Sequence, residues 1–213
     1  MDLILMLVDF VLHFDKHLSQ IILAYGTLTY LFLFLIIFCE TGLVVTPFLP
    51  GDSLLFAAGA FAAAGSLDIS LLFLMLATAA IVGDSTNYLI GRKLGKKVTA
   101  MNVIKPEHLD KTHAYFEKYG GKTLIIARFA PFLRTFAPFV AGVGHMTYRR
   151  FLMFSVTGGL LWISIFVFGG FFFGNLPFVK ENFKLVIIGV IGVSLLPALI
   201  EVLRHRLKPV KTP

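Results

Sequence analysis

Two apolar stretches with paired prolines decide the fold of this chain: ETGLVVTPFLPGDSLLFAAGAFAAA at Glu40–Ala64 and TLIIARFAPFLRTFAPFVAGVG at Thr123–Gly144. Each is hydrophobic enough to enter a membrane, yet two internal prolines would remove backbone hydrogen bonds from a continuous helix. The prolines are Pro47, Pro50, Pro131 and Pro138. Because unpaired backbone groups cannot face lipid, a broken segment at this depth must be shielded by protein or line a wet cavity. We therefore predict two re-entrant hairpins, over residues 40–66 and 123–144, that are broken at these prolines and meet near the midplane.

The composition of the chain places it in a membrane. Its 213 residues are 57% hydrophobic and 15% charged, whereas a soluble domain has about 45–50% and about 25%. This balance excludes a disordered protein, and the single cysteine, Cys39, excludes a disulfide scaffold. The 23 phenylalanines and Trp162 are typical of a lipid-facing surface. We expect one integral membrane domain over residues 1–213, since a second folded domain has no room.

Four other stretches have the length of a transmembrane helix, which needs about 20 apolar residues. They are Ile21–Cys39, Ile69–Ile90, Phe151–Phe173 and Phe183–Ile200, the last being a C-terminal transmembrane helix. Residues 1–18 are interrupted by Asp9, His13 and Asp15, which predicts an N-terminal amphipathic helix at the membrane interface. We expect no cleaved signal peptide, because the first residues are acidic and no small-residue cleavage site follows.

The basic residues indicate the orientation of the chain. They gather in a loop over residues 92–122, at Arg149 and Arg150, and after Arg204. By the positive-inside rule these regions, including the C-terminus, are cytoplasmic. The two hairpins then open to opposite sides, and each is followed by a transmembrane helix. The predicted fold is an all-α integral membrane protein with inverted repeats, an architecture of many secondary transporters. Chance placement of prolines in an ordinary helix bundle is the alternative.

Four charged residues lie inside the hairpins, where an ionised group costs about 2.5–3.5 kcal/mol. They are Glu40, Asp52, Arg128 and Arg134. The acids can pair with the arginines, or the arginines can bind an anionic ligand, since a guanidinium fork suits a phosphate. We therefore assign Arg128 and Arg134 to substrate binding and Glu40 and Asp52 to proton coupling. The alternative is a buried salt-bridge cluster that only fixes the packing of the repeats.

A polar group lies near the end of the span Ile69–Ile90. Asp84 and Tyr88 are four residues apart and share one helical face, with Asn87 beside them. We expect these three residues to line a cavity. The alternative, equally open, is that they satisfy irregular backbone of the neighbouring hairpin.

These motifs resemble the DedA family of bacterial membrane proteins, also called SNARE-associated or VTT-domain proteins. The resemblance rests on Phe38–Gly42, Pro47–Asp52, Gly83, Asp84, Tyr88, Gly91, Arg92, Gly95, Arg128–Pro131, Arg134, Pro138, Ala141, Gly142, Gly158 and Trp162. It implies a bacterial inner-membrane protein that moves lipids, either returning undecaprenyl phosphate to the cytoplasmic leaflet or flipping phospholipids. It also implies that Glu40, Asp52, Arg128 and Arg134 are needed for function.

The expected function is that of a multi-pass flippase for a lipid phosphate, coupled to protons or to the membrane potential. Its partners are then membrane lipids and protons, and we expect no enzymatic activity, cofactor, metal or nucleic acid. The oligomeric state, including a homo-oligomer, is left open. Two alternatives are a small-ion or proton antiporter that uses the same acids and a non-transporting membrane scaffold. A sideways opening between the repeats favours the flippase, whereas a sealed charge cluster favours the scaffold.

Overall fold

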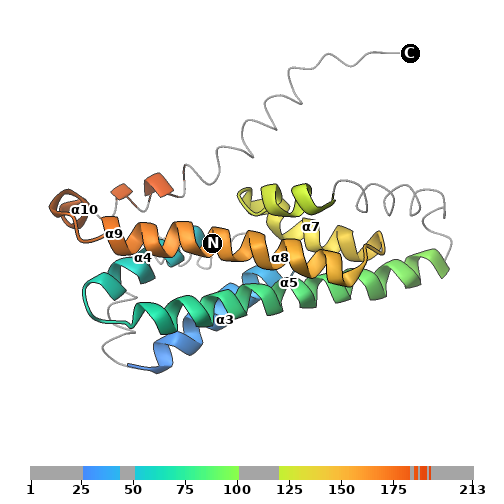
Figure 1. Ribbon diagram of the computed structural model, residues 1–213, viewed down its shortest axis with the longest axis horizontal. Helices are drawn as coiled ribbons and strands as arrows, with labels where there is room; N and C mark the ends of the chain where they lie inside the picture. Colours follow the sequence, from blue (N-terminus) through green and yellow to red (C-terminus); the bar gives the residue numbers. More distant parts are fainter. Residues whose placement is uncertain are drawn as a thin grey trace, which may run out of the picture.

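The computed structural model describes residues 26–43, 51–100, 120–182, 185–186, 188–190 and 192, and the regular elements in these ranges are all helical. In chain order they include α3 (Leu28–Gly42), α4 (Gly51–Ala63), α5 (Ile69–Ala100), a helix over residues 120–127, α7 (Pro131–Val143), α8 (Tyr148–Ile163), the π-helical η1 (Ser164–Phe168), α9 (Gly169–Phe173) and α10 (Pro177–Glu181) (Figure 1). The all-α prediction is thus confirmed for these residues. The expected helix over residues 1–18, the breaks at Pro47 and Pro50, and most of the C-terminal helix lie outside them.

Two long helices run antiparallel along the long axis of the described part (Figure 1). The first is α5, whose 32 residues span about 48 Å; it continues to Ala100, past the expected end at Ile90. The second joins α8, η1 and α9. Ile69–Gly95 and Tyr148–Phe173 are long and apolar enough to cross a membrane, and only 39% of the most apolar window of each is buried. The two expected spans are therefore helices, and most residues of their apolar windows are not buried within the described part, as lipid contact requires.

The second proline-containing stretch folds as two short helices. A helix over residues 120–127 is followed by a turn at 128–130, and α7 then runs back beside it (Figure 1). Pro131 is the first residue of α7, a position where a proline removes no helical hydrogen bond. Pro138 lies inside α7, which continues to Val143, so the expected break at Pro138 is wrong. The proline costs one hydrogen bond, and the close packing of α7 on α5 offsets this loss.

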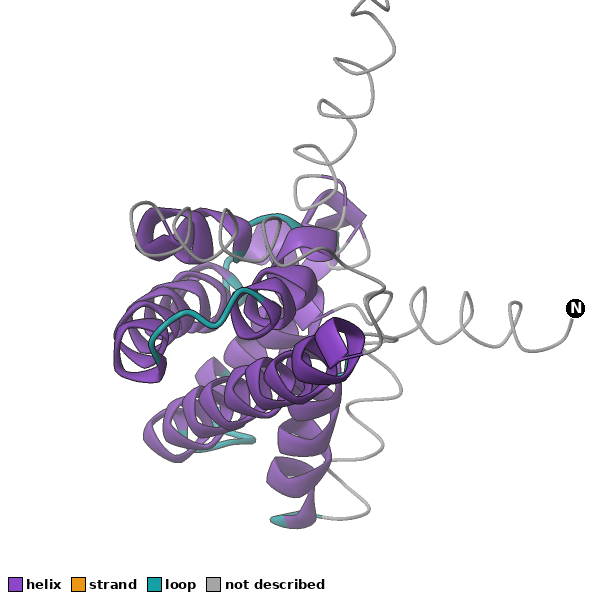
Figure 2. Cartoon of the chain, turned by 90° about the vertical axis from the view of Figure 1, so that its right-hand side faces the viewer, coloured by secondary structure: helices purple, strands orange, loops and turns teal. Residues whose placement is uncertain are grey.

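The two halves of the chain pack into one another through their short helices. The first half comprises α3, α4 and α5, and the second comprises the helix over residues 120–127, α7 and the long helix α8–η1–α9. Both halves thus have the order short helix, short helix, long helix. The second short helix of each half packs on the long helix of the other: α7 on α5, and α4 on η1 and α9. Figure 2, which looks along the long axis, shows the resulting single bundle. Neither half is therefore a complete packing unit alone.

Glycines make these two interfaces close. In α5, Gly91 and Gly95 are one turn apart, and a Cβ on Gly91 would overlap the Phe139 carbonyl of α7. Gly170 of α9 and Gly174, the residue that follows α9, have the same spacing, and a Cβ on Gly170 would overlap the Phe56 carbonyl of α4. Small residues at this spacing allow helix backbones to approach closely, which is how helices associate in membranes.

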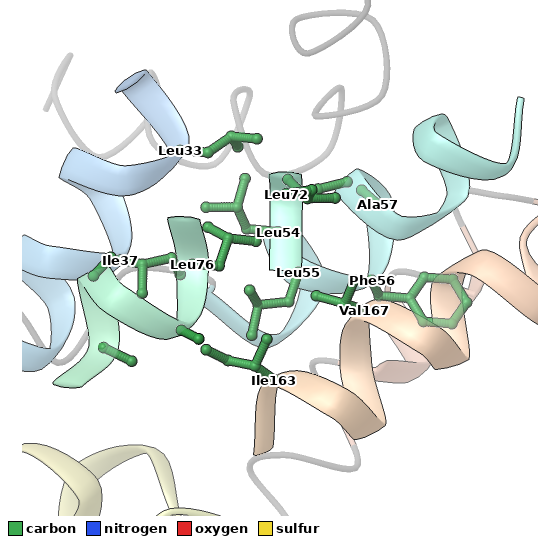
Figure 3. Close-up of a cluster of buried hydrophobic side chains, with 14 of the residues drawn as sticks. Leu33, Ile37, Leu54, Leu55, Phe56, Ala57, Leu72, Leu76, Ile163 and Val167 are labelled. Atoms are coloured by element: carbon green, nitrogen blue, oxygen red, sulfur yellow. The ribbon is translucent and has the colours of Figure 1, made fainter. Parts of the chain in front are cut away.

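A core of aliphatic side chains joins the first half to η1. Figure 3 shows part of it: Leu33 and Ile37 of α3, Leu54 and Leu55 of α4, Leu72 and Leu76 of α5, with Ile163 and Val167. A smaller cluster around Tyr88, Phe151 and Met146 joins α5 to the second half. The two clusters lie on either side of the polar residues described below.

The π-helical turn of η1 determines which residues of the second long helix face α4. Trp162 and Gly170 both face α4, because Trp162 contacts Asp52 and Gly170 lies against Phe56. Eight residues of regular α-helix turn about 80° beyond two full turns. The extra residue in a π turn absorbs about 100°. The two residues therefore share one face only because η1 interrupts the α-helix.

Two adjacent glycines of α9 provide a matched test of this packing. A Cβ on Gly170 would overlap backbone of α4, whereas a Cβ on Gly169 would lie 4.0 Å from the Phe56 ring, which is ordinary contact. We expect Gly170→Ala to lower the free energy of unfolding by about 1–3 kcal/mol. Gly169→Ala should leave it unchanged or raise it by up to about 1 kcal/mol, because alanine restricts the unfolded chain. Thermal unfolding of the two variants in detergent measures this difference, and equal effects would contradict the packing described.

Candidate functional site

The site is built from helix ends that meet where the chain breaks. Glu40 lies in the last turn of α3, and Asp52 in the first turn of α4. Arg128 lies in the turn before α7, and Arg134 in the first turn of α7. All four are buried, with at most 7% of each residue exposed. The structure thus brings the four charged residues singled out from the sequence into one buried region.

Arg134 pairs with both acids of the first half. Its Nη2 donates to Glu40 Oε1, and its Nη1 donates to Asp52 Oδ1 at 2.6 Å. Glu40 Oε1 also accepts the backbone N–H of Gly51 at 3.3 Å, at the first residue of α4. A guanidinium that bridges two carboxylates from two helices holds α3, α4 and α7 together.

The helix dipoles disfavour the charges of both Glu40 and Arg134, so each residue is stabilised by pairing with the other. The C-terminal end of α3 is partly negative and disfavours Glu40, while the N-terminal end of α7 is partly positive and disfavours Arg134. Asp52 and Arg128 lie at helix ends of the favourable sign. The two residues that their own helix dipoles disfavour are therefore bound to one another.

Arg128 pairs with a residue from the long helix α5. Its Nη2 donates to Asp84 Oδ2 and to the Ser155 carbonyl at 3.3 Å, and the Ser155 hydroxyl donates to Asp84 Oδ2 at 2.5 Å. Of the two possibilities that the sequence leaves open, the pairing of each arginine with a hairpin acid, Glu40 or Asp52, is wrong for Arg128, whose partner is Asp84. Those two acids are both bound to Arg134, so the partner of Arg128 comes from the span that follows the first hairpin.

Trp162 connects the two ion-pair groups. Its indole N–H donates to Asp52 Oδ1 at 2.8 Å, and its ring lies 5.0 Å from the Arg134 guanidinium and 5.8 Å from that of Arg128. The residue is fully buried, so its assignment to a lipid-facing surface is wrong. The missed signal is spacing: Ser155, Gly158, Gly159 and Trp162 lie on one face of the helix, at i, i+3, i+4 and i+7.

Asn87 and Tyr88 bind backbone carbonyls between the halves. The Asn87 amide donates to the Thr41 carbonyl at 3.0 Å and to the Thr135 carbonyl at 2.7 Å. The Tyr88 hydroxyl donates to the Met146 carbonyl at 2.5 Å. Helix ends and proline-containing helices leave carbonyls without helical partners. The two Asn87 contacts fit the alternative in which polar residues of α5 satisfy backbone of the hairpins, whereas Met146 follows the second hairpin.

The charges of the cluster do not balance. Three carboxylates (Glu40, Asp52, Asp84) face two guanidiniums, so the fully ionised cluster has a net charge of −1. All three acids lie in the first half of the chain and both bases in the second. Several buried atoms also have no hydrogen-bond partner among the described residues: Glu40 Oε2, Asp84 Oδ1, Asn87 Oδ1, Arg128 Nη1 and Arg134 Nε. The cluster therefore has capacity for additional protons or polar groups.

The part of the chain that the structure describes has no group of three or more His, Cys, Asp or Glu side chains arranged to hold a metal ion. The polar chemistry of the site is that of guanidinium, carboxyl, hydroxyl and amide groups, with the indole of Trp162. Such a set can bind an oxyanion and exchange a proton.

Comparisons with known proteins agree with this picture of a membrane protein. The VTT domain matches residues 49–172. The chain is 54% identical to Protein DedA of Escherichia coli K12, over 97% of this chain and 96% of that protein. It is 44% identical to an uncharacterized membrane protein of Mycobacterium tuberculosis H37Rv, over 80% and 77%, and 38% identical to inner membrane protein YqjA of E. coli K12, over 74% and 73%. No solved structure matches the chain.

The Arg134 bridge predicts a rescue. Arg134→Leu leaves Glu40 and Asp52 buried without a counter-charge, and we expect it to cost about 3–5 kcal/mol of stability. Adding Glu40→Gln removes one of the two uncompensated acids, so the double variant should be more stable than Arg134→Leu alone. Thermal unfolding in detergent of the wild type and these two variants measures the difference. A double variant that is less stable than Arg134→Leu would show that the two residues do not interact.

Proposed function

The chain belongs to the DedA family of VTT-domain membrane proteins, and we propose that it is a flippase that moves a lipid phosphate between the leaflets of the bacterial inner membrane. Undecaprenyl phosphate and a glycerophospholipid are the two substrates that we consider. The observation that carries the proposal is the pair of arginines buried where the two halves meet. A guanidinium presents a planar fork of donors that matches a phosphate.

The helix lengths support re-entrant hairpins at residues 40–66 and 123–144. The apolar helix inside each predicted hairpin, Gly51–Ala63 in the first and Pro131–Val143 in the second, has 13 residues, or about 20 Å. A bilayer core is about 30 Å thick, so neither helix crosses it. In this proposal α5 and α8–α9 span the membrane, each hairpin enters and leaves on one side, and the two hairpins open to opposite sides. The transmembrane helix expected at Ile21–Cys39 lies partly outside the described residues and stays a prediction.

The ends of the long helices support the proposed orientation. The last part of α5 contains Arg92 and Lys93, and the first turn of α8 contains Arg149 and Arg150. These ends lie at the same end of the bundle (Figure 1). By the positive-inside rule this end is cytoplasmic. The C-terminus is on the same side in this proposal, because the expected C-terminal transmembrane helix, most of which lies outside the described residues, would return the chain to it.

The charge imbalance supports proton coupling. The cluster reaches zero net charge when one of its three carboxyl groups takes up a proton, and an uncompensated charge at this depth is costly. Glu40 and Asp52 are the carriers that we propose. A proton that moves with an anionic lipid also reduces the charge carried across the membrane potential, which is worth about 2.3 kcal/mol per charge at 100 mV.

One observation favours a second function, a non-transporting membrane scaffold. The charged residues are buried and ion-paired in a closed cluster. A scaffold needs only this arrangement, whereas a flippase must open it to admit a headgroup. Transport measurements separate the two functions.

We expect wild-type protein in phosphatidylcholine proteoliposomes to move a fluorescent lipid phosphate between leaflets, and to do so faster when a pH difference is imposed. Glu40→Gln and Asp52→Asn should lose the response to the pH difference before they lose lipid binding, because they keep size and hydrogen bonding but cannot carry the proton. Quenching of outer-leaflet lipid measures the rate. Equal wild-type rates with and without the gradient would refute proton coupling, and no movement by folded protein would favour the scaffold.

The orientation predicts opposite labelling of two exposed positions. Ser66 lies between α4 and α5, and Arg149 lies at the start of α8. In a Cys39→Ser background, Ser66→Cys should react with a membrane-impermeant maleimide in intact cells. Arg149→Cys should react only after the membrane is permeabilised. The reverse pattern would invert the topology.

A further inference from the structure

The two arginines of the site are bound in different ways. Both terminal nitrogens of Arg134 are engaged by carboxylates, one by Glu40 and the other by Asp52. In Arg128 the Nη2 makes all the hydrogen bonds, to Asp84 and Ser155, and the Nη1 has no partner among the described residues. Arg128 is nonetheless 96% buried, with 4% exposed. It therefore has a free terminal donor in the interior, which Arg134 does not.

The position of Arg128 also differs. It lies in the turn between two helices, whereas Arg134 is fixed within α7. Its side chain runs along a strip of α8 that has no side chains: a Cβ on Gly158 would lie 3.4 Å from Arg128 Cγ, and one on Gly159 would lie 3.3 Å from its Nη2. The guanidinium of Arg128 therefore lies against the backbone of α8 at Gly159, and its Cζ is 5.8 Å from the centre of the Trp162 ring.

We infer that Arg128 is the residue that binds the lipid phosphate. When no phosphate is bound, the Asp84 carboxylate is paired with the Arg128 guanidinium and acts as a competing anion. This inference rests on the proposed function. It assigns phosphate binding to Arg128 and a structural role to Arg134, two arginines that the sequence does not distinguish. A carboxylate and a phosphate both offer oxygens at a spacing that a guanidinium binds in a bidentate manner. An incoming phosphate takes the place of the Asp84 carboxylate.

Asp84 is suited to leave Arg128. Its Oδ2 keeps the Ser155 hydroxyl as a donor, and its Oδ1 has free capacity to accept a bond. A proton on Asp84 removes the charge that competes for Arg128, so proton uptake and phosphate binding favour one another. The corresponding exchange at Arg134 would leave Glu40 and Asp52 both without a counter-charge, which is why we assign Arg134 to holding the helices together.

Binding to purified protein in phosphatidylcholine nanodiscs tests this inference. The probe is farnesyl phosphate, with farnesol and inorganic phosphate as parallel arms. The readout is the fluorescence of Trp162, which is the single tryptophan of the chain. Asp84→Asn should bind farnesyl phosphate at least about tenfold more tightly than wild type, because a charged competitor is removed. Glu40→Gln also removes one negative charge from the cluster, but Glu40 is paired with Arg134 and not with Arg128. This variant should therefore tighten binding less.

A second pair of variants does not depend on the folding of Asp84→Asn. Arg128→Lys should weaken farnesyl phosphate binding at least about tenfold, since the bidentate fork is lost, and Arg134→Lys should weaken it less. Farnesol should bind equally to all variants. Competition by inorganic phosphate at the same concentration would support the role of Arg128 but contradict a lipid substrate.

The outcomes separate the inference from the proposed function. Equal tightening by Asp84→Asn and Glu40→Gln, or equal weakening by the two lysine variants, would overturn the assignment of Arg128 even if wild-type protein moves lipid. Absence of lipid movement by wild type would overturn the flippase, while tighter binding to Asp84→Asn would still support Arg128 as the phosphate-holding residue.

Discussion

The pairing of buried acids from one half of the chain with buried arginines from the other is the constraint on which the rest of the structure depends. An uncompensated charge at apolar depth is costly, and breaking a buried pair is more destabilising than never having it. Arg134 bridges Glu40 and Asp52, and Arg128 binds Asp84. The halves must therefore meet at these residues, which fixes how the short helices lie against the long ones.

Packing of the backbone makes that meeting possible. The ion pairs join groups at helix ends to one another and to Asp84 inside α5, so the helices must approach until their backbones nearly touch. Gly91 in the first half and Gly170 in the second permit this at the two equivalent interfaces between the halves. The π turn at Ser164–Phe168 then brings Trp162 and Gly170 to one face of the same helix. Close contact and charge neutralisation are thus two aspects of one interface.

The sequence predicts the parts of this fold that follow from local composition. The long helices follow from apolar length, and the charged residues are recognisable because charge is rare in apolar segments. The partner of Arg128 is not predictable in this way, since Asp84 lies 44 residues away and reaches it only through the packing of α5. Pro138 was predicted as a break because local chemistry disfavours it in a helix; tertiary contacts of α7 keep the helix intact. Trp162 looked like a lipid-facing residue because composition cannot distinguish the two faces of a span.

The division of charge between the halves has a consequence for the biogenesis of the protein. The ribosome completes all three acids at Asp84, but the last arginine follows about 50 residues later, which takes roughly 3–10 s at ordinary synthesis rates. During that interval the nascent first half contains three carboxyl groups without their guanidinium partners. It must wait in a hydrated environment, in the insertion machinery or at the membrane surface, or enter the bilayer protonated. Final burial of the acids as ion pairs therefore has to follow synthesis of the second half as far as Arg134.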